Sequence, residues 1–490
     1  MLIPVRREES HALREFLRES GYTIQALAAI TGGESAAEMR TKVGWAKASL
    51  GAGRLNTLVR WFWLDSAVDV VEARGDIPDA VLDCFLRSGM LANEEGRFVP
   101  RVRISPFNQL FLLSDHVAAS KAAQAADTVL WPNPTTRLAS RMAMRNRVER
   151  TLDLGTGCGV LAILAAAHSG HVVATDLNPR TRDFCEFNAS LNGVENVEFR
   201  EGSGFEPVRG ERFDLILTNP PFFVTPKVRR VLSDSGRELD GFCRALVQES
   251  PAHLNEGGYC QMLAEWVQVK GQGWQERIGG WMAETGCDAW VIANYARSSV
   301  EYALSRMNED EDFVPGSEEQ VGRLRSWVEY FDARQVESIY GGMIVLRKRA
   351  GGVNWVRMEE VMTSFARPFG EALRQGFAVR DGMEGCTDAD LLRMLPLIGD
   401  GVRVQQESEV TSEGFRVRSM LLKVMEGIPY SMPVQPQIAE LMALCDGKRT
   451  IAEIIEETAA SMSMPAVLVE KAFCDLFRRF FDWGIAVLRA

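Results

Sequence analysis

The middle of the chain alternates between short apolar runs and stretches with apolar residues at helical spacing. Runs typical of buried strands occur at 150–154, 171–176, 197–200, 213–218 and 258–264, with helical patterns at 160–167, 180–191 and 239–254. Further strands are predicted at 289–294 and 336–347, and a charged helix at 318–331 precedes the last one. Such alternation predicts an α/β fold whose parallel sheet is covered on both faces.

Both flanks of this region have different patterns. Helical spacing at 11–20, 55–63 and 78–88 precedes a hairpin at 89–99, which is the order of elements in a winged-helix unit. Downstream, residues 391–417 mix helix and strand patterns, and helices within 437–490 flank a turn at 446–448. We therefore expect a helical, winged-helix-like domain at 1–105, a catalytic domain at 106–350, and a C-terminal α+β domain at 351–490 that ends in a winged-helix-like module.

The composition agrees with the predicted fold and restricts the kinds of partner that the protein could bind. Of 490 residues, 46% are hydrophobic and 25% charged, which is typical of globular domains in a chain too long for one core. The formal net charge of −11 lacks the basic excess of a dedicated nucleic-acid binder. Residues 227–230 and six arginines could still form a local basic groove, and the alternative is that they form a solvated face. The six are Arg101, Arg103, Arg137, Arg141, Arg145 and Arg147.

Cysteine and histidine placement favours a reducing compartment and no metal. The nine cysteines are scattered singly without a CxxC pair, so we expect buried thiols. The five histidines do not cluster with cysteines or carboxylates at metal-ligand spacing, and no metal is assigned. The first residues lack the apolar core of a signal peptide, and no apolar run reaches the length of a membrane span. We expect a soluble, cytoplasmic protein with no membrane partner.

A Gly-rich turn at residues 151–159 (Thr-Leu-Asp-Leu-Gly-Thr-Gly-Cys-Gly) is the strongest local signal. An apolar strand leads directly into it, and a helix with free backbone N–H groups follows. Its G-x-G-x-G spacing differs from the dinucleotide fingerprint and suits a cofactor without pyrophosphate. Asp176 ends the next strand, where a carboxylate can accept from ribose hydroxyls, and Asp153 suits the ammonium of an amino-acid tail. Either Asp alone could be a cap or turn residue; with the glycines, the ligand interpretation prevails.

A second polar turn, Asn-Pro-Pro-Phe at residues 219–222, ends the strand at 213–218. The two prolines fix the backbone and remove two donors, so the rigid turn presents the Asn219 side-chain oxygen and the Pro220 carbonyl as acceptors. A planar NH₂ group could donate to both while Phe222 stacks on its face, which would aim the nitrogen for in-line methyl transfer. Downstream, residues 234–236 and the pair Asp240-Gly241 are expected to cap a helix.

Together these motifs resemble the class I S-adenosylmethionine-dependent methyltransferases of the small (NPPF/NPPY) type. That group includes release-factor glutamine-N5, ribosomal RNA guanine-N2 and adenine-N6 methyltransferases. The resemblance covers about residues 130–350 and implies a Rossmann-like, seven-stranded, mostly parallel sheet. It implies that S-adenosylmethionine is bound by Asp153, Gly155, Thr156, Gly157, Gly159, Asp176, Leu177 and Ser203, and that the catalytic residues are Asn219, Pro220, Pro221 and Phe222. Many relatives carry an acid after the third strand where this chain has Ser203, so Ser203 or a backbone carbonyl would meet the adenine amine.

Three functions remain open at this point. The first is methylation of a protein glutamine amide, slightly favoured by the acidic composition and by the last 55 residues. Those residues resemble a compact winged-helix module that binds peptides in some modification enzymes, although core packing also explains the match. The second is methylation of an exocyclic amine in RNA or DNA, which needs the basic groove. The third, a non-catalytic scaffold, is disfavoured by the intact turn at Asn219. The oligomeric state stays open.

Overall fold

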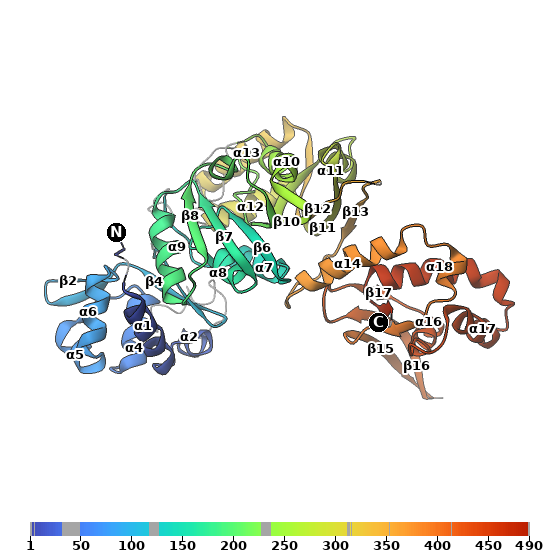
Figure 1. Ribbon diagram of the computed structural model, residues 1–490, viewed down its shortest axis with the longest axis horizontal. Coiled ribbons are helices and arrows are strands. Elements are labelled where there is room, and N and C mark those ends of the chain that lie inside the picture. Colours follow the sequence, from blue (N-terminus) through green and yellow to red (C-terminus); the bar gives the residue numbers. More distant parts are fainter. Residues whose placement is uncertain are drawn as a thin grey trace. The chain divides into compact units, whose positions relative to one another are not determined.

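The computed structural model in Figure 1 describes residues 2–3, 5–31, 50–116, 127–226, 237–310, 314, 316–351, 353–412 and 414–488. The stretches 227–230 and 234–236, considered above, lie outside these residues. The chain forms two compact units: residues 1–139 with 147–359, and residues 140–146 with 360–490. The three-domain division stays a prediction, and its boundary at residue 105 falls inside strand β4 (Arg103–Phe107).

An eight-stranded mixed sheet forms the centre of the first unit. Its strands are β6 (Val148–Leu154), β7 (Ser169–Asp176), β8 (Val197–Glu201), β9 (Phe213–Thr218), β10 (Leu254–Val269), β11 (Cys287–Ser298), β12 (Val336–Lys348) and β13 (Val356–Glu360). Their order is β13-β11-β12-β10-β9-β6-β7-β8. The pairs from β8 to β10 are parallel, whereas β12 is antiparallel to both its neighbours. The expected α/β class is confirmed, but the sheet has eight strands instead of seven, because β13 extends it beyond β11.

Four helices of this unit lie close to where the apolar periodicity predicted them: α8 (Val160–Ala166), α9 (Arg180–Leu191), α10 (Gly241–Glu249) and α13 (Glu318–Asp332). The structure adds three helices that the periodicity did not predict, α7 (Pro134–Met142), α11 (Trp274–Met282) and α12 (Ser299–Asp310). Helix α8 contacts β6 and β7, α9 contacts β8, and α11 contacts β10 (Figure 1). The helix predicted at 239–254 ends early, because Pro251 follows in a short 3₁₀ turn at Ser250–His253.

The first hundred residues form a small α/β assembly within the same unit. Its helices are α1 (Arg7–Glu19), α2 (Ile24–Thr31), α4 (Arg54–Phe62), α5 (Val70–Asp76) and α6 (Asp79–Arg87). The strands β1 (Val68–Asp69), β2 (Leu91–Glu94) and β3 (Arg97–Pro100) make a sheet in the order β1-β3-β2. Trp61 is fully buried at its centre, edge-on to Phe85 and Phe98, and its indole N–H donates to the Phe98 carbonyl. The predicted hairpin is confirmed as β2–β3.

Two asparagines of α9 hold the hairpin of β4 and β5 (Leu110–Ser114). Asn188 accepts the Leu113 N–H at 2.7 Å and donates to the Leu113 carbonyl at 2.9 Å. One helical turn later, Asn192 makes the same pair of bonds with Phe111. The side-chain amides therefore satisfy backbone groups of β5 as a neighbouring strand would. This arrangement gives Asn188 and Asn192 a structural role.

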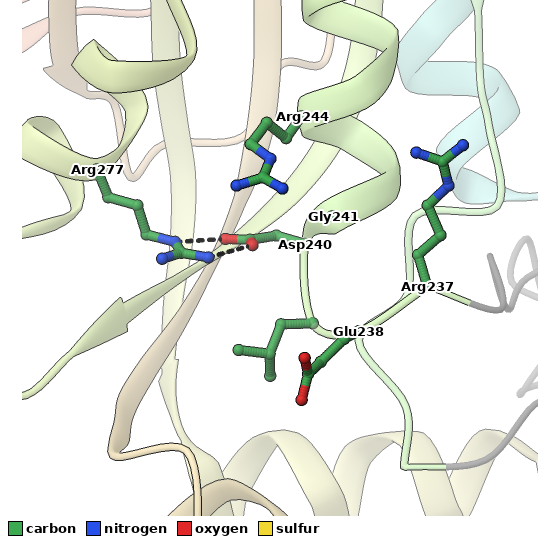
Figure 2. A pocket seen from close by; sticks show the side chains of 7 residues that line it. Arg237, Glu238, Asp240, Gly241, Arg244 and Arg277 are labelled. Carbon is green, nitrogen blue, oxygen red and sulfur yellow. Dashed lines mark hydrogen bonds and ion pairs between the residues drawn. The ribbon is translucent and has the colours of Figure 1, made fainter.

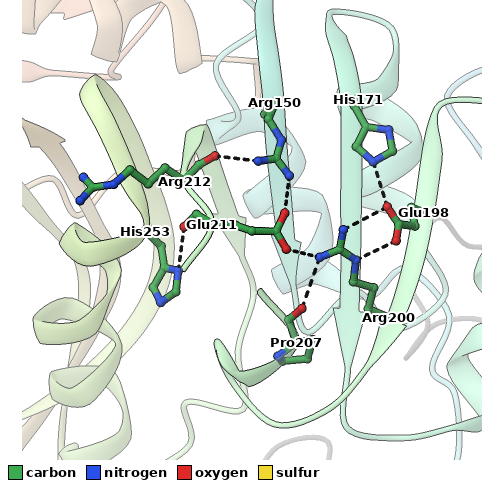
Figure 3. Close-up of polar contacts among 8 residues, drawn as sticks. All are labelled: Arg150, His171, Glu198, Arg200, Pro207, Glu211, Arg212 and His253. Atoms are coloured by element: carbon green, nitrogen blue, oxygen red, sulfur yellow. Dashed lines mark hydrogen bonds and ion pairs between the residues drawn. The ribbon is translucent and has the colours of Figure 1, made fainter. Parts of the chain in front are cut away.

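A network of charged side chains connects neighbouring strands of the sheet, as Figure 3 shows. Glu211, just before β9, accepts from Arg150 of β6 at 2.5 Å and from Arg200 of β8. Arg200 also binds Glu198, which pairs with His171 of β7 at 3.1 Å. These pairs are partly exposed, so each contributes little alone, but the network links β6, β7 and β8 with the segment that precedes β9.

The second unit has two small sheets and five helices among its described residues. The helices are α14 (Gly370–Met383), α15 (Asp388–Leu391), α16 (Pro436–Ala443), α17 (Ile451–Ser461) and α18 (Ala466–Asp482). Strands β15 (Val402–Thr411), β16 (Gly414–Val424) and β17 (Ser431–Pro433) form one sheet, and β14 (Pro396–Ile398) pairs with β18 (Ala486–Leu488). Thr450 and Glu453 form the capping box that starts α17.

The cysteines and the lengths of the helices bear on two further predictions from the sequence. All nine cysteines are free, and eight of them are buried, as the scattered pattern predicted. Across the ranges that the structure describes, no helix combines the length and the apolar character needed to cross a membrane.

Candidate active site

The register of the parallel strands brings the predicted site residues to one edge of the sheet. Asp153 of β6 pairs with Ala174 of β7 and with Leu217 of β9. Asp176 therefore lies two residues beyond Ala174, and Asn219 lies two residues beyond Leu217. The carboxyl ends of parallel strands are where open α/β sheets bind ligands. A cavity of about 530 Å³ lies here, with lining from Gly155, Thr156, Gly157, Asp176, Leu177, Ser203, Asn219, Pro220 and Pro221.

The Gly-rich turn needs its glycines for two different reasons. Gly155 and Gly157 have φ of +73° and +54°, and a Cβ at either position would meet no atom within 4 Å. They are required by backbone conformation, and they leave the cavity side open. Gly159, with φ of +85°, starts α8, and a Cβ there would lie 2.9 Å from Cys185 Sγ of α9. This third glycine permits the close approach of the two helices.

Asp153 is fully buried, with one carboxylate oxygen satisfied and the other without a partner. Its Oδ2 accepts from the Thr156 hydroxyl at 2.6 Å and from the Ala162 N–H at 2.9 Å. Its Oδ1 has no hydrogen-bond partner. Burial raises the pKa of Asp153 to about 7, although these two bonds oppose the shift. A buried acceptor without a donor is the feature expected of a residue that binds a cationic group.

Asp176 holds the other side of the same turn. Its Oδ2 accepts the Gly157 N–H and its Oδ1 the Asn178 N–H, both at 2.9 Å. Burial raises the pKa of this carboxyl as well. Leu177 is 55% exposed beside it, an unusual exposure for a leucine that lines a cavity. Ser203 lines the cavity from the loop after β8, as the adenine-binding role implied by the resemblance requires.

Asn219 lines the cavity and has one buried acceptor without a partner. Its Nδ2 donates to the hydroxyls of Thr135 and Thr136, at 3.3 and 3.4 Å, and its Oδ1 is buried without a partner. The two threonines lie in the first turn of α7, which follows Asn133. Sequence reasoning missed these residues. The only signal was Pro-Asn-Pro-Thr-Thr at 132–136, where an Asn before Pro marks the start of a helix.

Of the other residues of the Asn-Pro-Pro-Phe turn, the two prolines line the cavity and the phenylalanine is packed in the core. Pro220 and Pro221 line the cavity, whereas Phe222 is 8% exposed and outside the lining. Phe222 packs edge-on against Phe223, with ring centroids 5.0 Å apart. The flat apolar surfaces facing the cavity come instead from Trp131, Phe242 and other residues. The geometry thus gives Phe222 a packing contact in the place where stacking on a substrate was predicted.

A buried polar cluster behind this turn was also missed. Glu265, fully buried in β10, accepts from the hydroxyls of Tyr295 and Tyr302. The N–H of Val224, two residues after Phe222, donates to Glu265 at 3.3 Å and to the Tyr302 hydroxyl at 3.0 Å. Burial raises the pKa of Glu265, while the nearby Arg306 and the two tyrosines oppose that shift. The cluster anchors the downstream end of the turn to the sheet.

A second hollow, of about 280 Å³, lies at the start of α10 (Figure 2). Asp240 occupies the N-cap position of this helix, as predicted, but its side chain makes no capping bond. Its carboxylate accepts instead from Arg277 of α11, at 2.5 and 2.9 Å, and from the Val267 N–H of β10 at 3.0 Å. This buried ion pair ties α10 to its neighbours, and α10 supplies Phe242 and Leu246 to the larger cavity.

Most arginines of the supposed basic groove make contacts within their own unit. Arg101 pairs with Glu94, and the Arg103 guanidinium lies 3.7 Å from the ring centre of Trp63 and 4.2 Å from that of Trp131. Two others are also held: Arg137 lies over Phe107, and Arg141 donates to the Phe365 carbonyl at 2.9 Å. The described residues therefore give little support to a basic groove.

Comparison with known proteins agrees with this geometry. The methyltransferase small domain family matches residues 133–272, which run from the start of α7 past the end of β10. Release factor glutamine methyltransferase of Xylella fastidiosa is 36% identical over 133 residues, which cover 24% of this chain and 48% of that protein. The ribosomal protein uL3 glutamine methyltransferase of Bradyrhizobium diazoefficiens is 35% identical over 124 residues, which cover 23% of this chain and 39% of that protein.

One relative is matched over more of its length. Release factor glutamine methyltransferase of Deinococcus radiodurans is 34% identical over 188 residues, which cover 34% of this chain and 67% of that protein. By contrast, the chain spans about half the length of the Xylella relative. The residues matched by the family model include the Gly-rich turn, Asp176 and the turn at Asn219. The chain therefore belongs to the class I S-adenosylmethionine-dependent methyltransferases of the small type.

Proposed function

We propose that the protein is an S-adenosylmethionine-dependent N-methyltransferase that modifies the side-chain amide of a glutamine in another protein. The observation that carries this proposal is the buried, unpartnered Asn219 Oδ1 at the cavity that also contains the Gly-rich turn. An amide NH₂ group is planar and has two N–H donors, so it can satisfy this acceptor and still turn its nitrogen toward a methyl donor.

The residues around the Gly-rich turn fit the donor. When bound, S-adenosylmethionine supplies an electrophilic methyl group. The free Asp153 Oδ1 suits its ammonium, and Asp176, already rigidly held by two backbone N–H groups, suits the ribose hydroxyls. Gly155 and Gly157 leave room beside the backbone. Ser203 or a carbonyl of its loop would accept from the adenine amine, in place of the acid found in many relatives.

The polar groups of the turn would act mainly by placement. In this proposal Asn219 Oδ1 accepts one N–H of the target amide, and the carbonyl of Pro220, which lines the same cavity, accepts the second. Positive charge that develops on the nitrogen during transfer is stabilised by these acceptors. Trp131 and Phe242 supply apolar walls that restrict water around the amide. The prolines keep the acceptors fixed, so the turn requires little reorganisation during the reaction.

The names of the relatives support a protein as the substrate, because they specify a release factor or the ribosomal protein uL3. A cytoplasmic site of action would follow from such substrates. The nucleic-acid alternative loses its main support, since Arg101, Arg103, Arg137 and Arg141 are engaged in intramolecular contacts.

The flanking elements are proposed to recognise the macromolecule that carries the amide. The order α4-β1-α5-α6-β2-β3, with its sheet order β1-β3-β2, supports a winged-helix-like unit at the N-terminus. In the second unit, three helices from α16 to α18 followed by β18, which pairs with β14, support a similar module. We propose that these modules bind the protein substrate and not the methyl donor.

Transfer of labelled methyl groups tests the proposal directly. The purified enzyme, methyl-labelled S-adenosylmethionine and either a bacterial release factor, ribosomal protein uL3 or total RNA are incubated separately. We expect label in protein, with peptide mass spectrometry locating one added methyl group on a glutamine. Label that enters RNA and is released by ribonuclease would refute the protein-substrate proposal, as would the absence of label in both proteins.

Cofactor affinity should depend on the protonation of Asp153. With its pKa raised to about 7, this carboxyl is protonated below that pH and cannot accept from an ammonium. We expect the affinity for S-adenosylhomocysteine, which carries the same amino-acid tail, to fall roughly tenfold per pH unit below about 7. Titration calorimetry between pH 5.5 and 8 measures this, with Asp153→Asn as the control that removes the titrating group. Equal pH slopes in both proteins would contradict the assignment.

The same raised pKa also affects folding, with a definite sign. The folded protein binds the Asp153 proton more tightly than the unfolded chain, whose carboxyl has its ordinary pKa of 3.8. The stability contributed by this group is therefore fully present below about pH 3.8 and is lost as the pH rises to about 7. In the free protein, Asp153→Asn should remove this dependence.

A further inference from the structure

The orientation of the Asn219 amide is determined by a chain of hydrogen bonds that begins at a backbone group. The Thr136 N–H lies 2.9 Å from the Asn133 side chain. A backbone N–H can only donate, so the Asn133 atom that faces it is the oxygen and not the nitrogen. This bond is the N-cap of α7, and it fixes which way the Asn133 amide points.

The next bonds fix the two hydroxyl protons. The hydroxyls of Thr135 and Thr136 lie 2.7 and 3.0 Å from the same Asn133 oxygen. That oxygen has no proton to give, so each hydroxyl must donate its single proton to it. Only lone pairs then remain on the two hydroxyls. Toward any other neighbour, both threonines act as acceptors.

These lone pairs face Asn219. The two hydroxyl oxygens lie 3.3 and 3.4 Å from its amide and can only accept, so Asn219 must present its NH₂ group to them. Its oxygen is left pointing away, buried and without a partner at the cavity that Asn133 and Thr136 also line. The opposite orientation would set the Asn219 oxygen against two acceptors and turn N–H groups toward the cavity.

We infer that Asn133, Thr135 and Thr136 are positioning residues that make the site accept hydrogen bonds only. This rests on the proposed function, in which Asn219 Oδ1 binds an N–H of the target amide. Target groups with an N–H, such as a glutamine amide, fit an acceptor of this kind. A glutamate carboxylate at the same place has no N–H and would meet the oxygen with like polarity, so the polarity of Asn219 excludes it. The threonines thereby contribute to specificity through the orientation of Asn219.

Paired substitutions test this role. Thr135→Val with Thr136→Val keeps the shape of both side chains but removes the hydroxyls, and Thr135→Ser with Thr136→Ser keeps the hydroxyls. With a bacterial release factor as substrate, we expect the valine pair to lower kcat about 10- to 100-fold, since Asn219 becomes free to flip and its buried bonds are lost. The serine pair should retain most of kcat. Affinity for S-adenosylhomocysteine should be unchanged in both.

A spectroscopic measurement separates this inference from the proposed function. In protein labelled with ¹⁵N-asparagine, the Asn219 side-chain NH₂ signal, assigned by its loss in Asn219→Ala, should shift and exchange faster in the valine pair but not in the serine pair. Equal spectra and equal kcat in the two pairs would overturn the positioning role while leaving glutamine methylation intact. A wild-type enzyme that methylates no glutamine would refute the proposed function, and the NMR comparison would still decide whether the threonines orient Asn219.

Discussion

Asn219→Ala is expected to lower the rate of methyl transfer by about 100- to 1,000-fold, the usual cost of removing one fixed group that stabilises developing charge. The side chain supplies the buried Oδ1 that would hold the target nitrogen. The Asn219 side chain donates to Thr135 and Thr136 of α7 and not to the Gly-rich turn, so the affinity for S-adenosylhomocysteine should change little. Single-turnover transfer to a release factor, together with titration calorimetry, measures both quantities on the full chain.

A matched control separates the loss of chemistry from a loss of folding. Asn196→Ala removes another asparagine of the same unit, whose Nδ2 donates to the carbonyls of Ala166 and Ser169 outside the cavity. That variant should lose some stability but retain transfer by the folded fraction. Full activity of Asn219→Ala would show that the turn does not hold the reacting nitrogen, and the proposed chemistry would then be wrong.

The site residues at the strand ends were predictable because a local sequence pattern marks each strand end. Asp153, Asp176 and Asn219 each lie at or just after the end of an apolar strand, and a parallel sheet brings such ends together whatever the distance along the chain. The Gly-rich turn was equally predictable, since three positive φ angles within five residues require glycine. Local signals of this kind do not depend on the packing of distant segments.

The residues that orient Asn219 could not be found in this way. Thr135 and Thr136 lie more than 80 positions from Asn219, and their sequence indicates only the start of a helix. Strands β15 and β16 escaped for a different reason. Nearly every residue of β15 and the first half of β16 are exposed, so the alternation of buried and exposed positions that marks a strand is missing there. Strand β13 is short, and its place at the edge of the sheet depends on tertiary packing.

The Glu265 cluster could not be predicted from the sequence, because a single carboxylate in an apolar strand produces no periodic pattern. Its geometry depends on a row across three strands, in which Gly341 of β12 pairs with Glu265 on one side and with Tyr295 on the other. A Cβ on Gly341 would lie 2.1 Å from the Tyr295 ring. The missing side chain thus lets the tyrosine cross the middle strand and reach the carboxylate.

Glu265→Ala is expected to lower the free energy of unfolding of the first unit by about 3–5 kcal/mol, the scale found when one partner of a buried charged cluster is removed. The buried hydroxyls of Tyr295 and Tyr302 would lose their acceptor, and Arg306, which is 6% exposed, would lose a nearby opposite charge. Glu265→Gln keeps one acceptor oxygen and should cost less. Urea unfolding followed by hydrogen–deuterium exchange of β10 resolves this unit from the other.

The same variant should affect the reaction as well as the fold, because Val224 connects the cluster to the turn at Asn219. Loss of the bond from its N–H to Glu265 leaves that N–H bonded only to the Tyr302 hydroxyl. We expect transfer by the folded fraction of Glu265→Ala to fall, whereas Tyr295→Phe, which removes a hydroxyl that does not contact Val224, should lose stability with little change in transfer. Equal effects of both variants on transfer would show that the cluster supports the sheet but not the placement of Asn219.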